Sequence, residues 1–277
     1  MRYALVSDIH GNLRAWQAVW HDRVGRDVDQ VICLGDLVGY GPHPAEVTAA
    51  VRANVNYAVR GNHDAGVTGH FDTSLFNEDA REMLGWTAQH LGRAALRYLE
   101  GLPYVIEIDG GSLSAACVHG SMYRPEDFRY VFTEQEARKS WEACGAEVIF
   151  VGHTHLARVD VLGPDGAAHS RLLPSDVTLE RGSRYVVNVG SVGIPRAGDP
   201  FAYYCTFDTR ERRVRWHRVS YDLKGFKADL RARMGDAPHV RALIRSFSRT
   251  LHGPDAGPAP AAAPAPPVEA GAGGPKP

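Results

Sequence analysis

The stretch YALVSDIHGN, residues 3–12, joins a short apolar run to a cluster of polar side chains. The run from Tyr3 to Ser7 is typical of an interior strand in a sheet that is covered on both faces. Asp8 and His10 follow where the strand ends, beside a glycine that allows a sharp turn. The stretch therefore predicts a buried strand that delivers a carboxylate and an imidazole to one edge of a sheet.

The same arrangement recurs along the chain, as an apolar run followed by a polar motif. Val31 to Leu34 precedes GDLVGYG (35–41), Val55 to Val59 precedes GNHD (61–64), Leu113 to Val118 runs into VHG (118–120), and Val148 to Val151 precedes GHTH (152–155). In open α/β sheets, ligands bind at the carboxyl ends of strands. These motifs are therefore expected to converge on one pocket, although they lie far apart in the sequence.

The order of the other elements indicates the fold class. Helical spacing begins at Leu13 and again at Pro44, and 77–99 has the pattern of one long helix capped by Asn77. The second half is rich in strands, with hairpins expected around 109–112 and 163–166, further strands at 185–189, 202–207 and 214–221, and helical spacing from Lys224 to about Leu251. These elements indicate an α/β fold in which two sheets pack face to face with helices outside.

The composition indicates one catalytic domain followed by a tail. Residues 1–252 suffice for one core, whereas 253–277 are rich in Pro, Ala and Gly and are predicted to be disordered. A proline-rich recognition segment is the alternative for this tail. The oligomeric state stays open, because the large apolar residues could lie either in the core or in a dimer interface.

Charge and cysteine content limit the partners and the compartment. The 31 Lys and Arg residues nearly balance the 32 Asp and Glu residues, so nucleic acid is not the expected partner. The four cysteines are widely spaced without CxxC pairing, which is typical of reduced thiols. Neither a leader-like N-terminus nor an apolar segment of membrane-spanning length is evident, so we expect a cytoplasmic protein without a membrane partner.

The polar motifs contain the donor types that divalent cations prefer. The set combines carboxylates, imidazoles and an amide oxygen: Asp8, His10, Asp36, Asn62, His119, His153 and His155. Residues two apart in an extended segment share a face, which applies to Asp8 with His10 and to His153 with His155. Asp36 has two oxygens and can bridge. The set predicts two divalent cations, with manganese as the first expectation and iron, cobalt, nickel or zinc as alternatives.

In their order, D-x-H, GD, GNH, H and GHxH, the motifs resemble the calcineurin-like metallophosphoesterase superfamily from Met1 to Arg196. The resemblance implies a dinuclear site in a four-layer α-β-β-α sandwich of two mixed sheets. It assigns Asp8, His10, Asp36 and His155 to one metal, and Asp36, Asn62, His119 and His153 to the other. It also implies hydrolysis of phosphoester or phosphoanhydride bonds by metal-activated water.

Residues beside the expected ligands are candidates for proton transfer and substrate binding. His63 is not a ligand in the family pattern and is predicted to be the general acid, with Asp64 as its orienting partner. A hydrogen-bonding role that fixes the ligands is the alternative for His63. The segment NVGSVGIPR (188–196) resembles a segment of the smaller bacterial and archaeal phosphodiesterase-like branch, with Val189 in place of a proline. Ser191 and Arg196 are therefore candidates for phosphate binding, and a tight turn between strands is the alternative.

The substrate is the least determined property. The best narrow hypothesis is symmetrical hydrolysis of diadenosine tetraphosphate to ADP. However, LVGYG stands where that branch carries a VDRG-like sequence with a phosphate-gripping arginine. Arg60, Arg124, Arg129 and Arg196 are candidates for the missing charge, and Tyr40, Tyr123, Phe128 and Tyr130 for stacking on a base. Small-molecule or cyclic-nucleotide phosphodiesterase, serine/threonine phosphoprotein phosphatase and a non-catalytic scaffold are the alternatives.

Overall fold

Two mixed sheets form the centre of the molecule. The computed structural model describes residues 1–109 and 113–249. The first sheet has the spatial order β3 (Tyr57–Ala58), β2 (Gln30–Cys33), β1 (Arg2–Val6), β11 (Ala202–Asp208), β12 (Arg213–Val219) and β9 (Asp176–Thr178). The second has the order β4 (Val105–Asp109), β5 (Ser114–Val118), β6 (Val148–Val151), β10 (Arg184–Asn188), β7 (Arg158–Leu162) and β8 (Ala168–Leu172).

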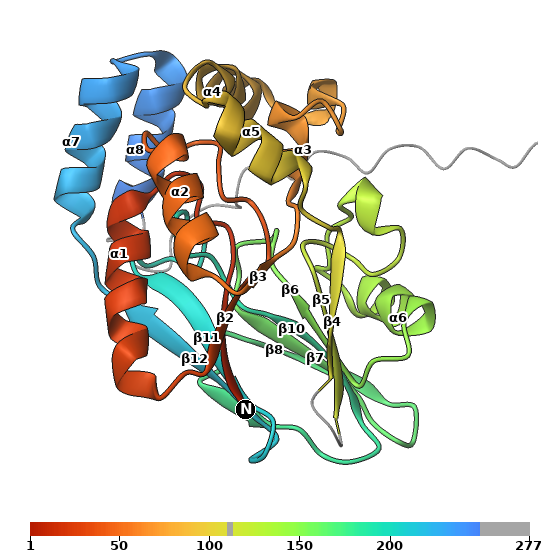
Figure 1. Cartoon of the computed structure of the whole chain (residues 1–277). Coiled ribbons are helices and arrows are strands. Elements are labelled where there is room, and N and C mark those ends of the chain that lie inside the picture. Colours follow the sequence, from red (N-terminus) through yellow and green to blue (C-terminus); the bar gives the residue numbers. More distant parts are fainter. Residues whose placement is uncertain (110–112, 250–277) are drawn as a thin grey trace, which may run out of the picture.

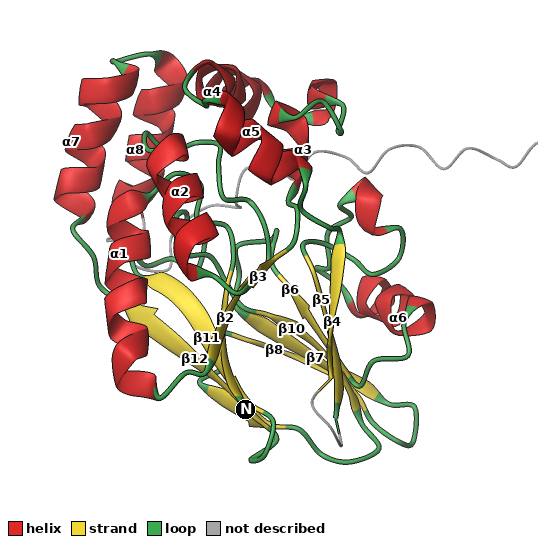
Figure 2. Cartoon of the chain, in the orientation of Figure 1, coloured by secondary structure: helices red, strands yellow, loops and turns green. Residues whose placement is uncertain are grey.

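Helices cover the outer faces of both sheets, as Figures 1 and 2 show. Over the first sheet lie α1 (Leu13–Asp22), α2 (Pro44–Asn54) and α5 (Arg93–Glu100), whereas α6 (Glu134–Ala143) covers the second. A third group of helices packs together at one end of the molecule: α4 (Glu78–Gln89), α7 (Leu223–Met234) and α8 (Pro238–Arg249). The short α3 (Asn62–Val67) is the remaining α-helix among the described residues. The α-β-β-α sandwich that the sequence resemblance implied is confirmed.

Alternation along the strands explains why the sheets pack on both faces. In β1, Tyr3 and Leu5 point into the core between the sheets, while Ala4 and Val6 pack against the outer helices. Phe150 of β6 and Phe207 of β11 meet across the sheets with ring centroids 5.0 Å apart.

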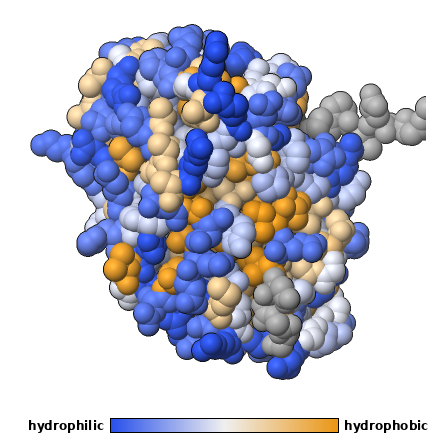
Figure 3. All heavy atoms as spheres, in the orientation of Figure 1, coloured by the Kyte–Doolittle hydropathy of each residue, from blue (hydrophilic) through white to orange (hydrophobic). Residues whose placement is uncertain are grey.

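Hydrophilic residues cover most of the face in Figure 3, and apolar residues gather near its centre, in front of the space between the sheets.

Parallel pairing brings the polar motifs together. The strands β1, β2 and β3 are parallel neighbours in the first sheet, as are β5, β6 and β10 in the second. The motifs 7–12, 35–41 and 61–64 follow the first three strands, and 119–120, 152–155 and 189–196 follow the other three. The carboxyl ends of both parallel sets therefore face one common region.

Several expected elements differ in their bounds. The segment 77–99 forms two helices, because α4 ends at Gln89 with His90 as its C-cap and α5 begins at Arg93 with Gly92 as its N-cap. Gly235 at φ 78° and Pro238 likewise separate α7 from α8. The strand expected at 55–59 is confined to Tyr57–Ala58, since Val55 still caps α2. Strand β9 was not expected.

Other sequence-based expectations meet the structure only in part. Of the turn expected at 109–112, Asp109 ends β4, and residues 110–112 lie outside the described residues, as does the tail at 253–277. Across 1–109 and 113–249, no helix combines the length and apolar character needed to cross a membrane. All four cysteines are free; Cys33, Cys117 and Cys205 are buried and Cys144 is half-buried.

Candidate metal centre

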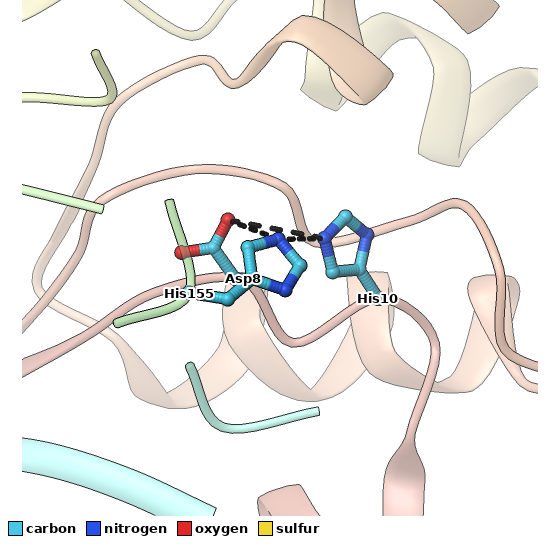
Figure 4. A group of neighbouring side chains, drawn as sticks. All are labelled: Asp8, His10 and His155. Atoms are coloured by element: carbon cyan, nitrogen blue, oxygen red, sulfur yellow. Dashed lines mark hydrogen bonds and ion pairs between the residues drawn. The ribbon is translucent and has the colours of Figure 1, made fainter. Parts of the chain in front are cut away.

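One group of donors forms where the motifs after β1 and β6 meet. Figure 4 shows the Asp8 carboxylate facing the imidazoles of His10 and His155. Asp8 Oδ1 lies 3.2 Å from His155 Nε2 and 3.8 Å from His10 Nε2. The two Nε2 atoms are 3.1 Å apart. Asp36 adds Oδ2 at 3.5 Å from His10 Nε2.

A second group shares Asp36 with the first. Asp36 Oδ2 lies 3.3 Å from His119 Nε2. That nitrogen is in turn 3.1 Å from His153 Nδ1 and 3.1 Å from Asn62 Oδ1. The Asp36 oxygen therefore stands between the two groups, where a bridging ligand has to be.

The backbone fixes which atom of each side chain faces the centre. The Nδ1 atoms of His10, His119 and His155 lie 2.9, 2.7 and 2.6 Å from the carbonyls of Val38, Leu34 and Ile194. A carbonyl accepts only from N–H, so in the neutral ring each Nε2 presents a lone pair. The carboxylates are held similarly: Asp8 Oδ2 accepts from His153 N, and Asp36 Oδ1 accepts from His63 N.

This arrangement fits a pair of divalent cations. Two imidazole lone pairs 3.1 Å apart repel unless a positive species lies between or beside them. Asp8 Oδ1 is buried and has no hydrogen-bond partner among the described residues, although buried polar atoms in proteins are generally paired. A buried set of carboxylate, imidazole and amide donors without thiolate matches hard or borderline cations.

The electrostatics point in the same direction. Burial alone raises the pKa of Asp8, but the His155 and His119 imidazoles outweigh it and hold this pKa below its usual range. Burial lowers the pKa of His119, yet Asp36 and Asp8 overcome this and raise it to about 9. When no cation is bound, a proton on His119 therefore interacts favourably with the carboxylates of Asp36 and Asp8. Cation binding displaces such protons, which couples affinity to pH.

The backbone at these loops is unusual. Asp8, His10, Asp36, His153 and His155 have φ between 49° and 65°, the left-handed region that side chains other than glycine rarely adopt. The expectation that Asp8–His10 and His153–His155 lie on extended segments is wrong, because all four residues have left-handed backbone. Such conformations cluster at functional sites, where the surrounding structure maintains them.

Comparison with known proteins agrees with this site. The model of the calcineurin-like phosphoesterase superfamily domain matches residues 1–212. The chain belongs to this superfamily. It is therefore a metallophosphoesterase, from a family of hydrolytic enzymes that use two metal ions.

Individual relatives support the assignment. An uncharacterised protein of Methanocaldococcus jannaschii is 34% identical over 221 residues, which cover 80% of this chain and 88% of that protein. The crystal structure of a metallophosphoesterase from Sphaerobacter thermophilus is similar with 35% identity and a TM-score of 0.75, covering 90% of this chain and 99% of the other. A hypothetical protein of Pyrococcus horikoshii shares the fold, with 21% identity, a TM-score of 0.68 and coverage of 87% and 97%.

In this phosphoesterase, His63 sits beside the first donor group. Its ring centroid is 4.8 Å from that of His10, 4.8 Å from Tyr40 and 4.8 Å from Phe76. His63 Nδ1 is buried and has no hydrogen-bond partner among the described residues. Burial lowers the pKa of His63 to about 4, so its imidazole is neutral near pH 7.

Asp64 lies apart from the His63 ring. Its carboxylate accepts hydrogen bonds from the backbone N–H groups of Asp36, Leu37, Val38 and Gly61, at 2.8 to 3.3 Å. These contacts tie the loop after β2 to the start of α3. The contact with His63 that the sequence-based prediction required is absent from the described hydrogen bonds, so the geometry gives Asp64 a structural role.

The loop after β10 supports the loop after β1. Ser191 Oγ donates to the Asp8 carbonyl at 3.0 Å and accepts from Ile194 N at 2.9 Å. Gly193 N donates to the same carbonyl at 2.9 Å. The hydroxyl of Ser191 is therefore engaged within the protein, which matches the alternative of a tight turn rather than phosphate binding.

Sequence reasoning missed two residues that stabilise these loops. Asn188 Nδ2 donates to the Gly152 carbonyl and to Thr154 Oγ1, which fixes the GHTH loop. Asn12 Nδ2 donates to the Gly193 carbonyl at 3.0 Å while its Oδ1 caps α1. Both asparagines stand inside the quoted motifs, but their partners are distant in sequence, so only their placement in the motifs hinted at a role.

The candidate substrate residues occupy different places. Arg60 donates to the Glu100 carbonyl, and its guanidinium lies over the Tyr104 ring, away from the metal ligands. Arg124 and Arg129 pair with Asp127. Arg196 lies next to the site, where its backbone N–H donates to the His155 carbonyl at 3.3 Å. Of these arginines, Arg196 is the one whose guanidinium has no ion pair or hydrogen bond within the described ranges.

Tyr40 and Tyr130 flank the donor groups. The Tyr40 ring meets His10 edge-on at 4.9 Å, and the Tyr130 ring stacks on His153. Burial raises the pKa of both hydroxyls, that of Tyr40 to about 12, and Arg196 opposes the rise at both. The charge of Arg196 therefore influences both Tyr40, which contacts His10, and Tyr130, which contacts His153.

Proposed function

We propose that this phosphoesterase holds two divalent cations, manganese first among them, and hydrolyses small phosphorylated molecules, with nucleotides as the substrate class. The observation that carries the proposal is the Asp36 Oδ2 atom, which faces both His10 and His119. Asp8, His10, Asp36 and His155 would hold one cation, and Asp36, Asn62, His119 and His153 the other. When bound, such a pair activates water and offsets charge on the phosphoryl oxygens.

We assign the protonation of the leaving group to His63. Its Nδ1 is without a partner, and its ring adjoins His10 at the edge of the donor set. An anionic phosphate beside the imidazole favours its protonated form and raises its pKa from about 4 toward neutrality. A bound substrate therefore supplies the charge that His63 needs to carry a proton.

Arg196 is the residue that we assign to phosphate binding. Its guanidinium has no acidic partner among the described residues and acts on both Tyr40 and Tyr130. A planar guanidinium pairs well with two phosphate oxygens. Arg60 does not share this role, because it is bound to the Glu100 carbonyl.

The substrate that we propose first is diadenosine tetraphosphate, cleaved symmetrically to ADP. Support comes from exposed aromatic rings on the segment that carries Tyr130: Tyr123 is 41% and Phe132 is 37% exposed. Exposed rings provide faces on which a nucleobase stacks. The free thiols favour a reducing compartment such as the cytoplasm for this reaction.

A small-molecule or cyclic-nucleotide phosphodiesterase is the second candidate. The feature that favours it is the segment 188–196, which resembles the phosphodiesterase-like branch and packs directly against the Asp8 carbonyl. A non-catalytic scaffold is disfavoured, because all the expected donors converge although a scaffold has no need of them.

Product analysis separates these functions. The manganese-loaded protein is incubated side by side with diadenosine tetraphosphate, bis(p-nitrophenyl) phosphate and p-nitrophenyl phosphate, with the Arg196→Lys variant run in parallel. Conversion of the first to ADP alone supports the tetraphosphatase. Turnover of only the diester supports the phosphodiesterase, and no turnover of any of the three contradicts both.

A further inference from the structure

His153 differs from the other imidazoles of the centre. His10, His119 and His155 direct Nε2 inward and anchor Nδ1 on a backbone carbonyl. His153 directs Nδ1 inward, toward His119 Nε2 at 3.1 Å. Its Nε2 has no hydrogen bond among the described residues. The anchor that fixes the ring plane of the other imidazoles is therefore missing for His153.

An aromatic ring takes the place of that anchor. The Tyr130 ring lies flat on the His153 ring, with centroids 3.9 Å apart and planes 11° apart. Phe132 stacks on the same tyrosine at 5.1 Å and 22°. Rotation of the His153 ring would drive its edge into Tyr130, so this stack limits the direction of Nδ1.

The segment that carries Tyr130 is itself well fixed. Phe128 and Val131, on either side, are 4% and 3% exposed. The Arg129 carbonyl accepts from Ser121 N at 2.9 Å, and a Cβ on Gly120 would approach that carbonyl to 2.6 Å. Tyr130 is thus held against His153 by a buried backbone rather than by a mobile surface loop.

We propose that Tyr130 is a positioning residue that sets the ring plane of His153 and thereby the affinity of the second cation site. The inference rests on the dinuclear site of the proposed function. Groups that orient a metal ligand commonly change metal affinity by about 10- to 100-fold when removed. The ring of Tyr130, not its hydroxyl, carries the effect, because the contact is face to face.

The test compares metal binding by full-length variants. Tyr130→Leu removes the flat ring, Tyr130→Phe keeps it, and Tyr57→Leu removes an exposed tyrosine ring of β3 as a matched control. Manganese is titrated into each metal-free protein, bound metal per chain is measured by elemental analysis after dialysis, and free manganese is followed by electron paramagnetic resonance.

The wild type, Tyr130→Phe and Tyr57→Leu should bind two ions with similar affinities, whereas Tyr130→Leu should keep one site and bind the second ion about 10- to 100-fold more weakly. Wild-type affinities in Tyr130→Leu would overturn the inference, as would equal losses in the Phe and Leu variants. If Tyr130→Leu does not fold in a melting measurement, Tyr130→Met answers the same question with an unbranched side chain. A wild type that binds fewer than two ions contradicts the proposed function itself.

Discussion

At the residue scale, both carboxylates and three of the imidazoles are specified by two contacts: one with the backbone and one with the centre. Asp36 illustrates this, because Oδ1 accepts from His63 N while Oδ2 faces His10 and His119. The carboxylate cannot rotate without losing the N–H bond. The protein therefore fixes the shared ligand before any cation arrives, which reduces the reorganisation that binding requires.

Asp36→Ala should abolish both manganese binding and turnover, because both donor groups lose their common oxygen. Metal content by elemental analysis and hydrolysis of the best substrate measure these effects. Asp72→Asn, which alters an exposed carboxylate that caps a short helix, serves as control and should leave both unchanged. A fully active Asp36→Ala protein would refute the site.

His63→Ala should keep both cations and lower kcat by roughly 10²- to 10⁴-fold, since the imidazole acts on the leaving group rather than on the metals. Single-turnover kinetics and metal content test this prediction together. His70→Ala changes an exposed histidine on the same segment and is the matched control. Loss of metal in His63→Ala would instead assign His63 to the ligand set.

At the element scale, the loops after the strands support one another across the two sheets. The loop after β10 binds the loop after β1 through Ser191, Gly193 and Asn12. The β1 loop in turn holds the β6 loop, because Asp8 Oδ2 accepts from His153 N. A change in any of these loops is therefore transmitted to the metal ligands.

Gly193→Ala should destabilise the protein by about 1–3 kcal/mol, because the new Cβ would lie 1.9 Å from the Ile9 carbonyl and force two buried loops apart. Denaturant unfolding measures the loss, and manganese titration should show weaker binding as well. Unchanged stability and binding would mean that the loops tolerate separation, contrary to the hydrogen bonds that join them.

Gly85→Ala should have the opposite effect on stability. Gly85 is exposed within α4, and a Cβ there meets nothing within 4 Å. Alanine favours the helix over glycine by roughly 1 kcal/mol, so the melting temperature should rise while kcat stays constant. A lower melting temperature would contradict the open surroundings of this position.

At the scale of the whole molecule, the site belongs to neither sheet alone. Three parallel strands of each sheet end at it, and the core residues between the sheets hold the two sets of ends in register. The C-terminal helices also contribute, because Ile194, whose carbonyl anchors His155, belongs to the same apolar cluster as Phe226 of α7. Mutations far from the metals can therefore disturb the ligands.

Removal of residues 253–277 should leave turnover and the melting temperature nearly unchanged. The segment is almost devoid of large apolar side chains, so it has little surface to contribute to a core. Thermal melting and substrate kinetics of the truncated chain test this. A large loss of activity would instead favour the recognition role for the tail.

Much of the fold and of the donor set was predictable, because short-range patterns encode them. Apolar runs mark the strands, and the residue types after them mark a cation site, as for Asp8 after β1 and His153 after β6. The helix break at 90–92 was less visible, since Leu91 continues the apolar pattern and is buried even though the helix stops. A buried apolar residue at position 91 therefore does not show that the helix continues through it.

The sequence by itself determined the residue types at the centre, their order and the membership of the superfamily. Only the tertiary structure decided that Asp64 binds backbone amides, that Arg60 turns toward Glu100, and that Tyr130 covers His153. Each of these outcomes depends on a partner from another segment of the chain. Such contacts cannot be predicted from the local sequence, because they form only when the two sheets pack and bring the strand ends together.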